Sequence, residues 1–279
     1  MQKIVFFGSG WYTIPVMQKL MPHGLDLVVT TERNPESHFL KFCSDNSITT
    51  LSVSTASEIT NHQSQIANHQ IAVLASFGAI IPHSILNSFP DGIINIHPSL
   101  LPKYKGPSPI QYALLNGENT TGVTLITLDD KVDHGPILSQ RPYELQGNET
   151  SQDLLSILFE IGAEMIEEQV IKLKNGEKLT STPQDHSKES WSKKISKKDG
   201  YIDIDQLNTG PYAIGSMIKA FYPWPGVWFT TLLKGQSKIV KLLPENKIQI
   251  EGKTPMNLKD FENGYGDEGR IILEKLGLN

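Results

Sequence analysis

The stretch that decides the fold is Ile93-Ile94-Asn95-Ile96-His97-Pro98-Ser99-Leu100-Leu101-Pro102. Its β-branched residues predict a buried strand, and that strand ends before Pro98 because proline cannot donate a hydrogen bond to a ladder. Side chains two positions apart on a strand point to the same face, so Asn95 and His97 project together where the strand gives way to a loop. In open α/β sheets, ligands bind at that end of the strands. Taken alone, the pair fits an ordinary strand end with two polar residues equally well.

A second stretch favours a catalytic explanation. Residues 122–128 form a β-rich run that leads into Asp129-Asp130-Lys131-Val132-Asp133-His134-Gly135. An acid on the loop after a neighbouring strand, here Asp133, can orient the ring of His97 and stabilise its charged form. The amide of Asn95 can donate to a developing oxyanion, and an imidazole can move a proton near neutral pH. Asn95, His97 and Asp133 are therefore the candidate catalytic residues.

The first half of the chain alternates strand and helix patterns. Residues 3–7 predict a short buried strand, and a glycine turn connects it to a helix at about 12–21. Further strands at 25–30 and 72–75, with helical patterns between and after them, predict a doubly wound parallel α/β sheet. A dinucleotide-binding fingerprint would need a third glycine where Thr13 stands, so NAD binding is disfavoured.

Composition places the chain among globular proteins of a reducing compartment. It has 279 residues, 38% of them hydrophobic, and can bury a sizeable core. The single cysteine, Cys43, excludes an internal disulfide, and its amphipathic surroundings predict a buried, inert thiol. No apolar run is long enough to span a bilayer, so we expect a cytoplasmic protein. The eight histidines are scattered and no cysteine pair exists, so no metal site is expected.

Charge is distributed unevenly along the chain. The net charge of −5 divides into −9 for residues 1–171 and +4 for residues 172–279. Such asymmetry is typical of a region that meets nucleic acid, although a solvated lysine-rich surface is at least as common. A long helix is predicted at 151–173, a polar linker follows to about residue 190, and short β-rich runs appear at 227–233, 239–243 and 247–250. We therefore expect one domain at 1–185 and a linker with a small second domain at 186–279.

These motifs together resemble a known family. The Asn95-x-His97 pair, the Ser99–Pro102 loop and the later Asp133-x-Gly135 are similar to the formyltransferases that use 10-formyltetrahydrofolate. Residues 191–203 and 218–228 resemble the second half of methionyl-tRNA formyltransferases in particular. The resemblance implies a Rossmann-like formyltransferase domain followed by a small β-barrel of the oligonucleotide-binding (OB-like) type. It also implies formyl transfer to the α-amino group of initiator methionyl-tRNA, in translation initiation, by a monomer.

The resemblance also assigns residues. Asn95, His97 and Asp133 would be catalytic. The folate would lie against backbone groups and apolar side chains from two segments: Phe77, Gly78, Ile80, Ser99, Leu100, Leu101 and Pro102. The tRNA would contact basic residues beside the site and in the linker: Arg33, Lys103, Lys105, Lys193, Lys194, Lys197 and Lys198.

Two departures keep alternatives open. The loop that enters the acceptor end of tRNA in the family is short here, at residues 30–38, and Arg33 is its only basic residue. About fifty residues follow Trp228, fewer than a five-stranded barrel of ordinary strands uses, so the second domain is abbreviated. A small amine such as an amino sugar nucleotide is therefore an alternative acceptor. A folate-binding or RNA-binding module without catalysis is a third possibility, which the intact Asn95, His97 and Asp133 set disfavours.

Overall fold

The computed structural model describes residues 3–206 and 212–278, which form two compact units. The first unit consists of the chain up to Gly106 with Thr120–Glu144 and Leu155–Trp191. The second contains Pro107–Asn119, Leu145–Leu154 and the chain from Ser192. The two units are groups of residues that pack together, whereas the division into domains at residue 185 stays a prediction.

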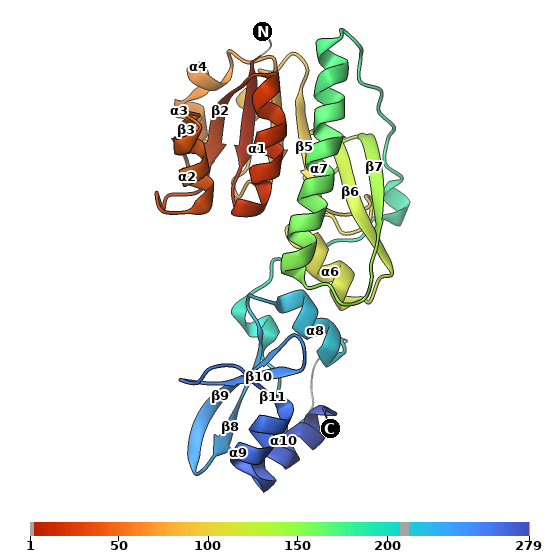
Figure 1. Ribbon diagram of the computed structural model, residues 1–279. Coiled ribbons are helices and arrows are strands. Elements are labelled where there is room, and N and C mark those ends of the chain that lie inside the picture. Colours follow the sequence, from red (N-terminus) through yellow and green to blue (C-terminus); the bar gives the residue numbers. More distant parts are fainter. Residues whose placement is uncertain (1–2, 207–211, 279) are drawn as a thin grey trace. The chain divides into compact units, whose positions relative to one another are not determined.

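The first unit is built on a seven-stranded mixed sheet with the order β3-β2-β1-β4-β5-β6-β7 (Figure 1). The first five strands in this order run parallel, as the alternating pattern predicts, but β6 and β7 are antiparallel to their neighbours. The strands are β1 (Ile4–Gly8), β2 (Leu25–Thr30), β3 (Thr49–Ser52), β4 (Ile71–Ala75), β5 (Ile93–His97), β6 (Thr120–Thr127) and β7 (Ile137–Glu144).

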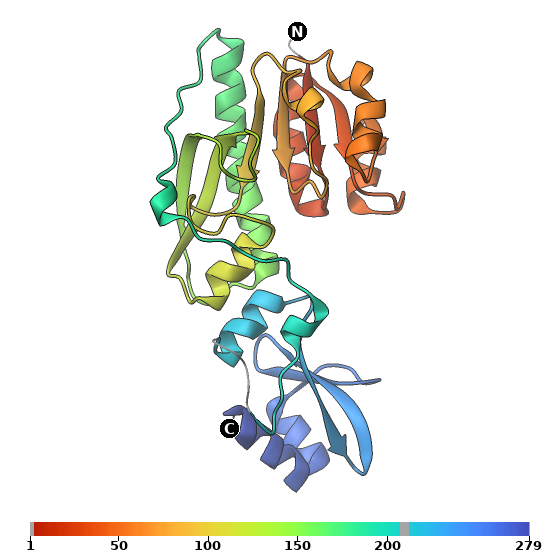
Figure 2. The ribbon, with the colours of Figure 1, turned by 180° about the vertical axis from the view of Figure 1, so that it is seen from behind.

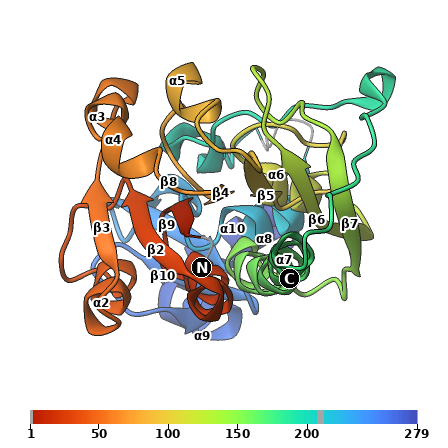
Figure 3. The ribbon, with the colours of Figure 1, turned by 90° about the horizontal axis from the view of Figure 1, so that it is seen from above.

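Helices cover both faces of this sheet, as the view in Figure 3 shows. Ile59, Ile66 and Ile85 of α3, α4 and α5 enter one core with the inward side chains of β1 and β2. On the other face lie α1, α2 and α7, and Gly162 of α7 packs directly against Ile96 of β5. The helices are α1 (Ile14–Leu20), α2 (His38–Asp45), α3 (Ala56–Asn61), α4 (Gln63–Ile66), α5 (His83–Leu86) and α7 (Ser151–Lys174), with 3-10 turns η1 (Trp11–Thr13), η2 (Met21–His23) and η3 (His186–Lys188).

The lone cysteine lies inside this unit. Cys43 is 1% exposed, and its Sγ lies 3.9 Å from Sδ of Met17. Burial raises the pKa of the thiol, because the thiolate would lose its hydration. The expectation of a buried thiol is confirmed.

The second unit contains a small antiparallel sheet of order β11-β10-β9-β8. Three of its strands fall where β-rich runs predict them, and the sheet is consistent with an abbreviated barrel. Two terminal helices and a helix after the linker were not expected from the sequence. The elements are α6 (Pro109–Leu115), η4 (Lys197–Gly200), α8 (Ile214–Phe221), β8 (Val227–Leu233), β9 (Gln236–Leu243), β10 (Lys247–Ile250), β11 (Met256–Asn257), α9 (Leu258–Tyr265) and α10 (Asp267–Leu276).

Among the residues that the structure describes, no helix is both long and apolar enough to cross a membrane.

Candidate active site

The strand β5 directs its polar residues to one face of the sheet. Because Ile96 faces α7, its neighbours Asn95 and His97 point to the opposite face. There the loop after β6 brings in Asp133, whose Oδ1 lies 3.4 Å from Asn95 Nδ2 and 3.6 Å from His97 Nδ1. All three residues are at most 9% exposed. The structure thus brings together the three residues that the sequence selects.

A short backbone segment completes this cluster. His97 Nε2 lies 3.0 Å from the carbonyl oxygen of Tyr104, and a carbonyl can only accept, so Nε2 carries a proton. Two residues later, the backbone N–H of Gly106 donates to Asp133 Oδ2 at 2.8 Å. The segment 104–106 therefore holds both the histidine and the aspartate. Backbone groups carry these contacts, so no side-chain pattern in the sequence could have indicated them.

The Ser99–Pro102 loop is fixed largely by its own buried polar groups. The Ser99 hydroxyl donates to the carbonyl of Lys103 at 2.7 Å, and Thr124 Oγ1 donates to the carbonyl of Ser99 at 2.6 Å. Thr124 Oγ1 also accepts from the backbone N–H of Leu101 at 3.0 Å. Ser99 and Leu101 are buried, whereas Leu100 and Pro102 are half-buried. A role for this loop in holding folate stays a prediction.

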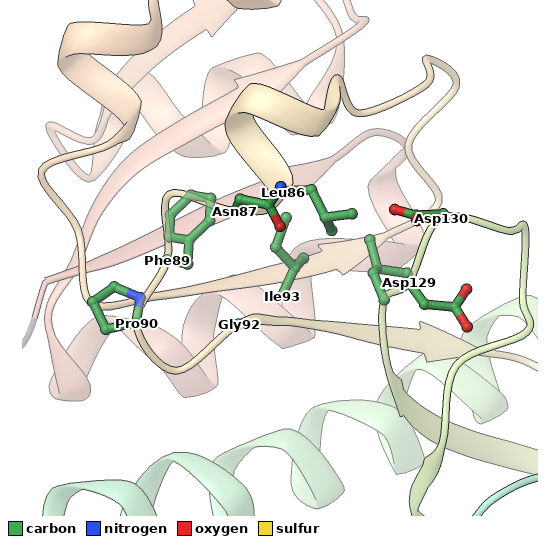
Figure 4. Close-up of a pocket in the computed structure, with 9 residues that line it drawn as sticks. Leu86, Asn87, Phe89, Pro90, Gly92, Ile93, Asp129 and Asp130 are labelled. Atoms are coloured by element: carbon green, nitrogen blue, oxygen red, sulfur yellow. The ribbon is translucent and has the colours of Figure 1, made fainter.

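A pocket of mixed polar and apolar lining opens on the same face of the sheet (Figure 4). Its volume is about 390 Å³, and Leu86 of α5 and Ile93 of β5 face each other inside it. Ile93 lies two residues before Asn95, and Asp129 and Asp130 at the rim lie on the loop that carries Asp133. The full lining is Leu86, Asn87, Phe89, Pro90, Gly92, Ile93, Leu128, Asp129 and Asp130.

The pocket differs from the one expected from the sequence. Phe77 packs against the same apolar cluster as Phe89 and Ile93, but it does not line the cavity. Gly78 and Ile80 are exposed, Ile80 by 79%. The sequence does not single out Leu86, Phe89 and Leu128, because apolar residues at helical or strand spacing look the same whether they fill a core or line a pocket.

The basic residues selected for tRNA divide into two groups. Most of them are exposed, namely Arg33, Lys103, Lys193, Lys194, Lys197 and Lys198. Arg33 Nε also donates to Ser54 Oγ at 3.1 Å. Lys105 is 0% exposed, and its ammonium lies 2.7 Å from Glu189 Oε2. A side chain enclosed and paired in this way does not reach a phosphate, so Lys105 is withdrawn from the tRNA-binding set.

The chain is similar in sequence to known proteins. Residues 23–170 match the family described as Formyl transferase. The chain belongs to the formyl transferase family. A methionyl-tRNA formyltransferase of Koribacter versatilis is 31% identical, with 94% of this chain and 95% of that protein covered. One from Roseiflexus castenholzii is 41% identical over 73% of this chain, and the match spans 64% of that relative's length.

A solved structure shares the fold of this formyl transferase. It is an N-formyltransferase from Helicobacter canadensis, crystallised with folinic acid and dTDP-3-aminofucose. The TM-score is 0.67 at 17% identity, with 90% of this chain and 95% of that chain covered. At this identity the similarity establishes the fold alone.

The buried side chains of this site are hydrogen-bond donors and acceptors. In the described residues, 3–206 and 212–278, no three His, Cys, Asp or Glu side chains gather as a metal site. The buried amide, imidazole and carboxylate can orient a nucleophile and stabilise developing negative charge.

Proposed function

We propose that the chain transfers a formyl group from 10-formyltetrahydrofolate to the α-amino group of initiator methionyl-tRNA, in translation initiation. The observation that carries the proposal is the buried cluster of Asn95, His97 and Asp133. A relative that matches over nearly the whole chain and is named methionyl-tRNA formyltransferase supports this acceptor.

In this proposal each side chain has a separate task. The bound donor supplies an electrophilic formyl carbon. Asn95 has a second amide hydrogen for the formyl oxygen, where negative charge develops. Oδ1 of Asp133 lies 3.4 and 3.6 Å from Asn95 and His97, beyond the length of good hydrogen bonds. While Oδ2 stays bound to Gly106, Oδ1 can therefore accept the proton of an incoming amine directly or through water. His97, held through Nε2, would stabilise the negative charge that develops on the formyl oxygen. As the amine nitrogen bonds to the formyl carbon, the bond from that carbon to the donor nitrogen breaks, and tetrahydrofolate leaves with the proton that Asp133 took from the amine.

The pocket beside Ile93 fits the flat ring of the folate. Leu86, Phe89 and Leu128 supply apolar walls, and the backbone of residues 90–93 supplies hydrogen-bonding groups. The pocket lies on the strand face that carries Asn95, so a ring seated there would direct its formyl group toward the catalytic cluster. We propose that these residues act together with the expected contacts from Phe77, Ser99 and Pro102.

The tRNA is proposed to bind through exposed cations. Phosphate contacts by lysine and arginine dominate such complexes. Lys193, Lys194, Lys197 and Lys198 are all exposed and follow directly on the segment that ends at Trp191. Arg33 and Lys103 would add contacts. We further propose that the protein acts as a monomer in the cytoplasm.

The test is formylation of methionyl-tRNA by the purified chain with 10-formyltetrahydrofolate. The product is measured by mass spectrometry of the amino acid released from the tRNA. Uncharged tRNA and the His97→Ala variant serve as controls. N-formylmethionine that appears only with charged tRNA and intact His97 supports the proposal, and its absence contradicts the proposal.

A small amine is the second candidate acceptor. The Helicobacter canadensis structure with a nucleotide-linked amino sugar shares the fold, and the loop at residues 30–38 has one basic residue. A nucleotide-linked amino sugar is therefore assayed beside methionyl-tRNA. Turnover with neither acceptor, together with measurable folate binding, would indicate the third possibility, a binding module without catalysis.

A further inference from the structure

We propose that residues 184–191, which we name the clamp segment, hold two loops in a fixed relative position: residues 102–106 and the loop that carries Asp133. In this proposal Lys105 and Gln184 are positioning residues. The inference rests on the proposed function and names residues beyond Asn95, His97 and Asp133. The chain approaches along β7 (Figure 2), where Ile137 and Thr182 exchange backbone hydrogen bonds of 2.8 Å. It then crosses the loops that carry Tyr104 and Asp133.

The first attachment is to the loop that holds His97. Ser190 accepts from the backbone N–H of Lys105 through its carbonyl at 2.9 Å, and from that of Tyr104 through its hydroxyl at 2.9 Å. The Ser190 N–H donates to the carbonyl of Pro102 at 3.2 Å. One residue of the clamp segment thus fixes the backbone on both sides of Lys103. This backbone includes the Tyr104 carbonyl that receives the His97 ring.

The second attachment is the buried side chain of Lys105. Its Nζ lies 2.7 Å from Glu189 Oε2 and 3.1 Å from His186 Nδ1, and 5.7 Å from the centre of the Trp191 ring. An ammonium removed from water is stable only with such partners, because its desolvation cost is large. The position of Lys105 between Tyr104 and Gly106 means that this anchor lies between the two backbone contacts to the catalytic residues.

The third attachment is to the loop that carries Asp133. Gln184 is 6% exposed, and its Nε2 donates to the carbonyls of Asp133 at 2.9 Å and Gly135 at 2.8 Å. The two loops are therefore tied to the same eight-residue segment. The position of the Asp133 loop against β5 sets the distances from Asp133 to Asn95 and His97, and residues 104–106 contact both His97 and Asp133.

Backbone strain explains why a clamp is needed. Tyr104 has φ of 55° and Asp133 has φ of 49°, in the left-handed region that disfavours residues with a Cβ. These are the two residues whose oxygens contact His97. Strained conformations persist only where surrounding contacts hold them. The hydrogen bonds from Ser190 and Gln184 supply those contacts.

The test uses two independent variants and a matched control. Lys105→Met replaces the buried ammonium with an uncharged side chain of similar length. Gln184→Leu removes the amide that holds the Asp133 loop. The control, Lys19→Met, breaks a lysine–glutamate pair of 2.8 Å with Glu167, between α1 and α7. All are compared below their melting temperatures, with the preferred acceptor of the wild-type protein.

We expect kcat to fall about tenfold or more in both clamp variants, because small misplacements of catalytic groups cost large factors in rate. KM for 10-formyltetrahydrofolate should stay within about twofold, since the proposed pocket is not altered. Hydrogen exchange should accelerate at the backbone amides of residues 103–106 and 129–135 in these variants and not in Lys19→Met.

Exchange is measured without an acceptor, so it tests the clamp even if the proposed function is wrong. Wild-type protein that formylates no acceptor would contradict the function and leave the exchange result to decide on the clamp. Unchanged exchange at both loops, or wild-type kcat in folded Gln184→Leu, would overturn the inference. If Lys105→Met does not fold, Gln184→Leu alone decides.

Discussion

At the scale of single residues, the proposed chemistry depends on Asn95 and His97, whose side-chain nitrogens lie 3.4 and 3.6 Å from Asp133 Oδ1. We predict that His97→Ala and Asp133→Asn lower kcat by about a hundredfold or more, the usual scale for acid–base groups. Asn95→Ala should cost a similar order through lost stabilisation of negative charge. Single-turnover rates measure these losses. Calorimetry with tetrahydrofolate should show retained binding, and near-wild-type turnover of His97→Ala would refute the assignment.

Gly135 explains why the Asp-x-Gly spacing is needed. A Cβ at this position would overlap the carbonyl oxygen of Thr127, which is backbone and cannot move aside cheaply. We predict that Gly135→Ala shifts the loop of Asp133 and lowers the melting temperature by several degrees, since a change of about 1 kcal/mol gives roughly 2–4 °C in a protein of this size. Gly92→Ala provides a contrast. Its φ of 78° would strain an alanine, but the added Cβ would meet no atom within 4 Å. A Gly135→Ala protein with wild-type melting and turnover would contradict this explanation.

At the scale of elements, the clamp segment introduces a pH dependence through His186. Its imidazole faces Lys105 at 3.1 Å and Glu189 at 3.7 Å, and it stacks on His134, which is bound to Asp129. Partial burial, His134 and Lys105 lower its pKa, so the unfolded chain takes up a proton more readily. The stability that neutral His186 supplies is therefore present above about pH 6.5 and is lost as the pH falls.

Melting curves at pH 7.5 and 5.5 measure this effect. Wild-type protein should lose more stability between these two values than His186→Gln, whose amide can still accept from Lys105. Hydrogen bonds from Lys105 and Trp191 lower the pKa of Glu189. Glu189 therefore stays ionised at both pH values and does not contribute to the difference in stability between them. Equal losses in the two proteins would show that His186 is not the titrating group.

The lysines after the clamp segment provide another test at this scale. Changing Lys193, Lys194, Lys197 and Lys198 to Ala should weaken tRNA binding and flatten its salt dependence by roughly one unit of slope per lost phosphate contact. A control of equal charge changes Lys41, Lys172, Lys178 and Lys259, which are also exposed. Filter binding at several salt concentrations compares the two. Equal effects would mean that net charge, and not this lysine cluster, controls affinity, and would favour Arg33 and Lys103 as the holding residues.

The bounds of helices and strands were predictable where apolar periodicity defines them. The direction of a strand was less predictable where the connecting chain determines it. The long helix α7 and the strands β2, β5 and β10 lie at or within a residue of the bounds that their apolar patterns indicate. The direction of β6 was not predictable, because it depends on how residues 98–119 return to the sheet. Asn95, His97 and Asp133 could be selected as chemistry-bearing side chains. Tyr104, Gly106 and Gln184 could not, since their roles come from backbone contacts and burial.

At the scale of the whole molecule, the proposed domain boundary can be tested with fragments. We predict that residues 1–185 fold as an α/β domain and bind folate, because their strands and long helix supply a core. A fragment of residues 1–191 should melt at a higher temperature, since it adds the Glu189 that pairs with buried Lys105. Circular dichroism measures both. An unfolded 1–185 fragment would place residues 186–279 within one core and move the boundary.

The most direct test of the central claim is the ratio of kcat/KM for methionyl-tRNA to that for a nucleotide-linked amino sugar, measured with 10-formyltetrahydrofolate on the same preparation. We predict a ratio well above one, and a loss of turnover with both acceptors when His97 is changed to Ala. A ratio below one would contradict the proposed acceptor and identify a small amine as the substrate.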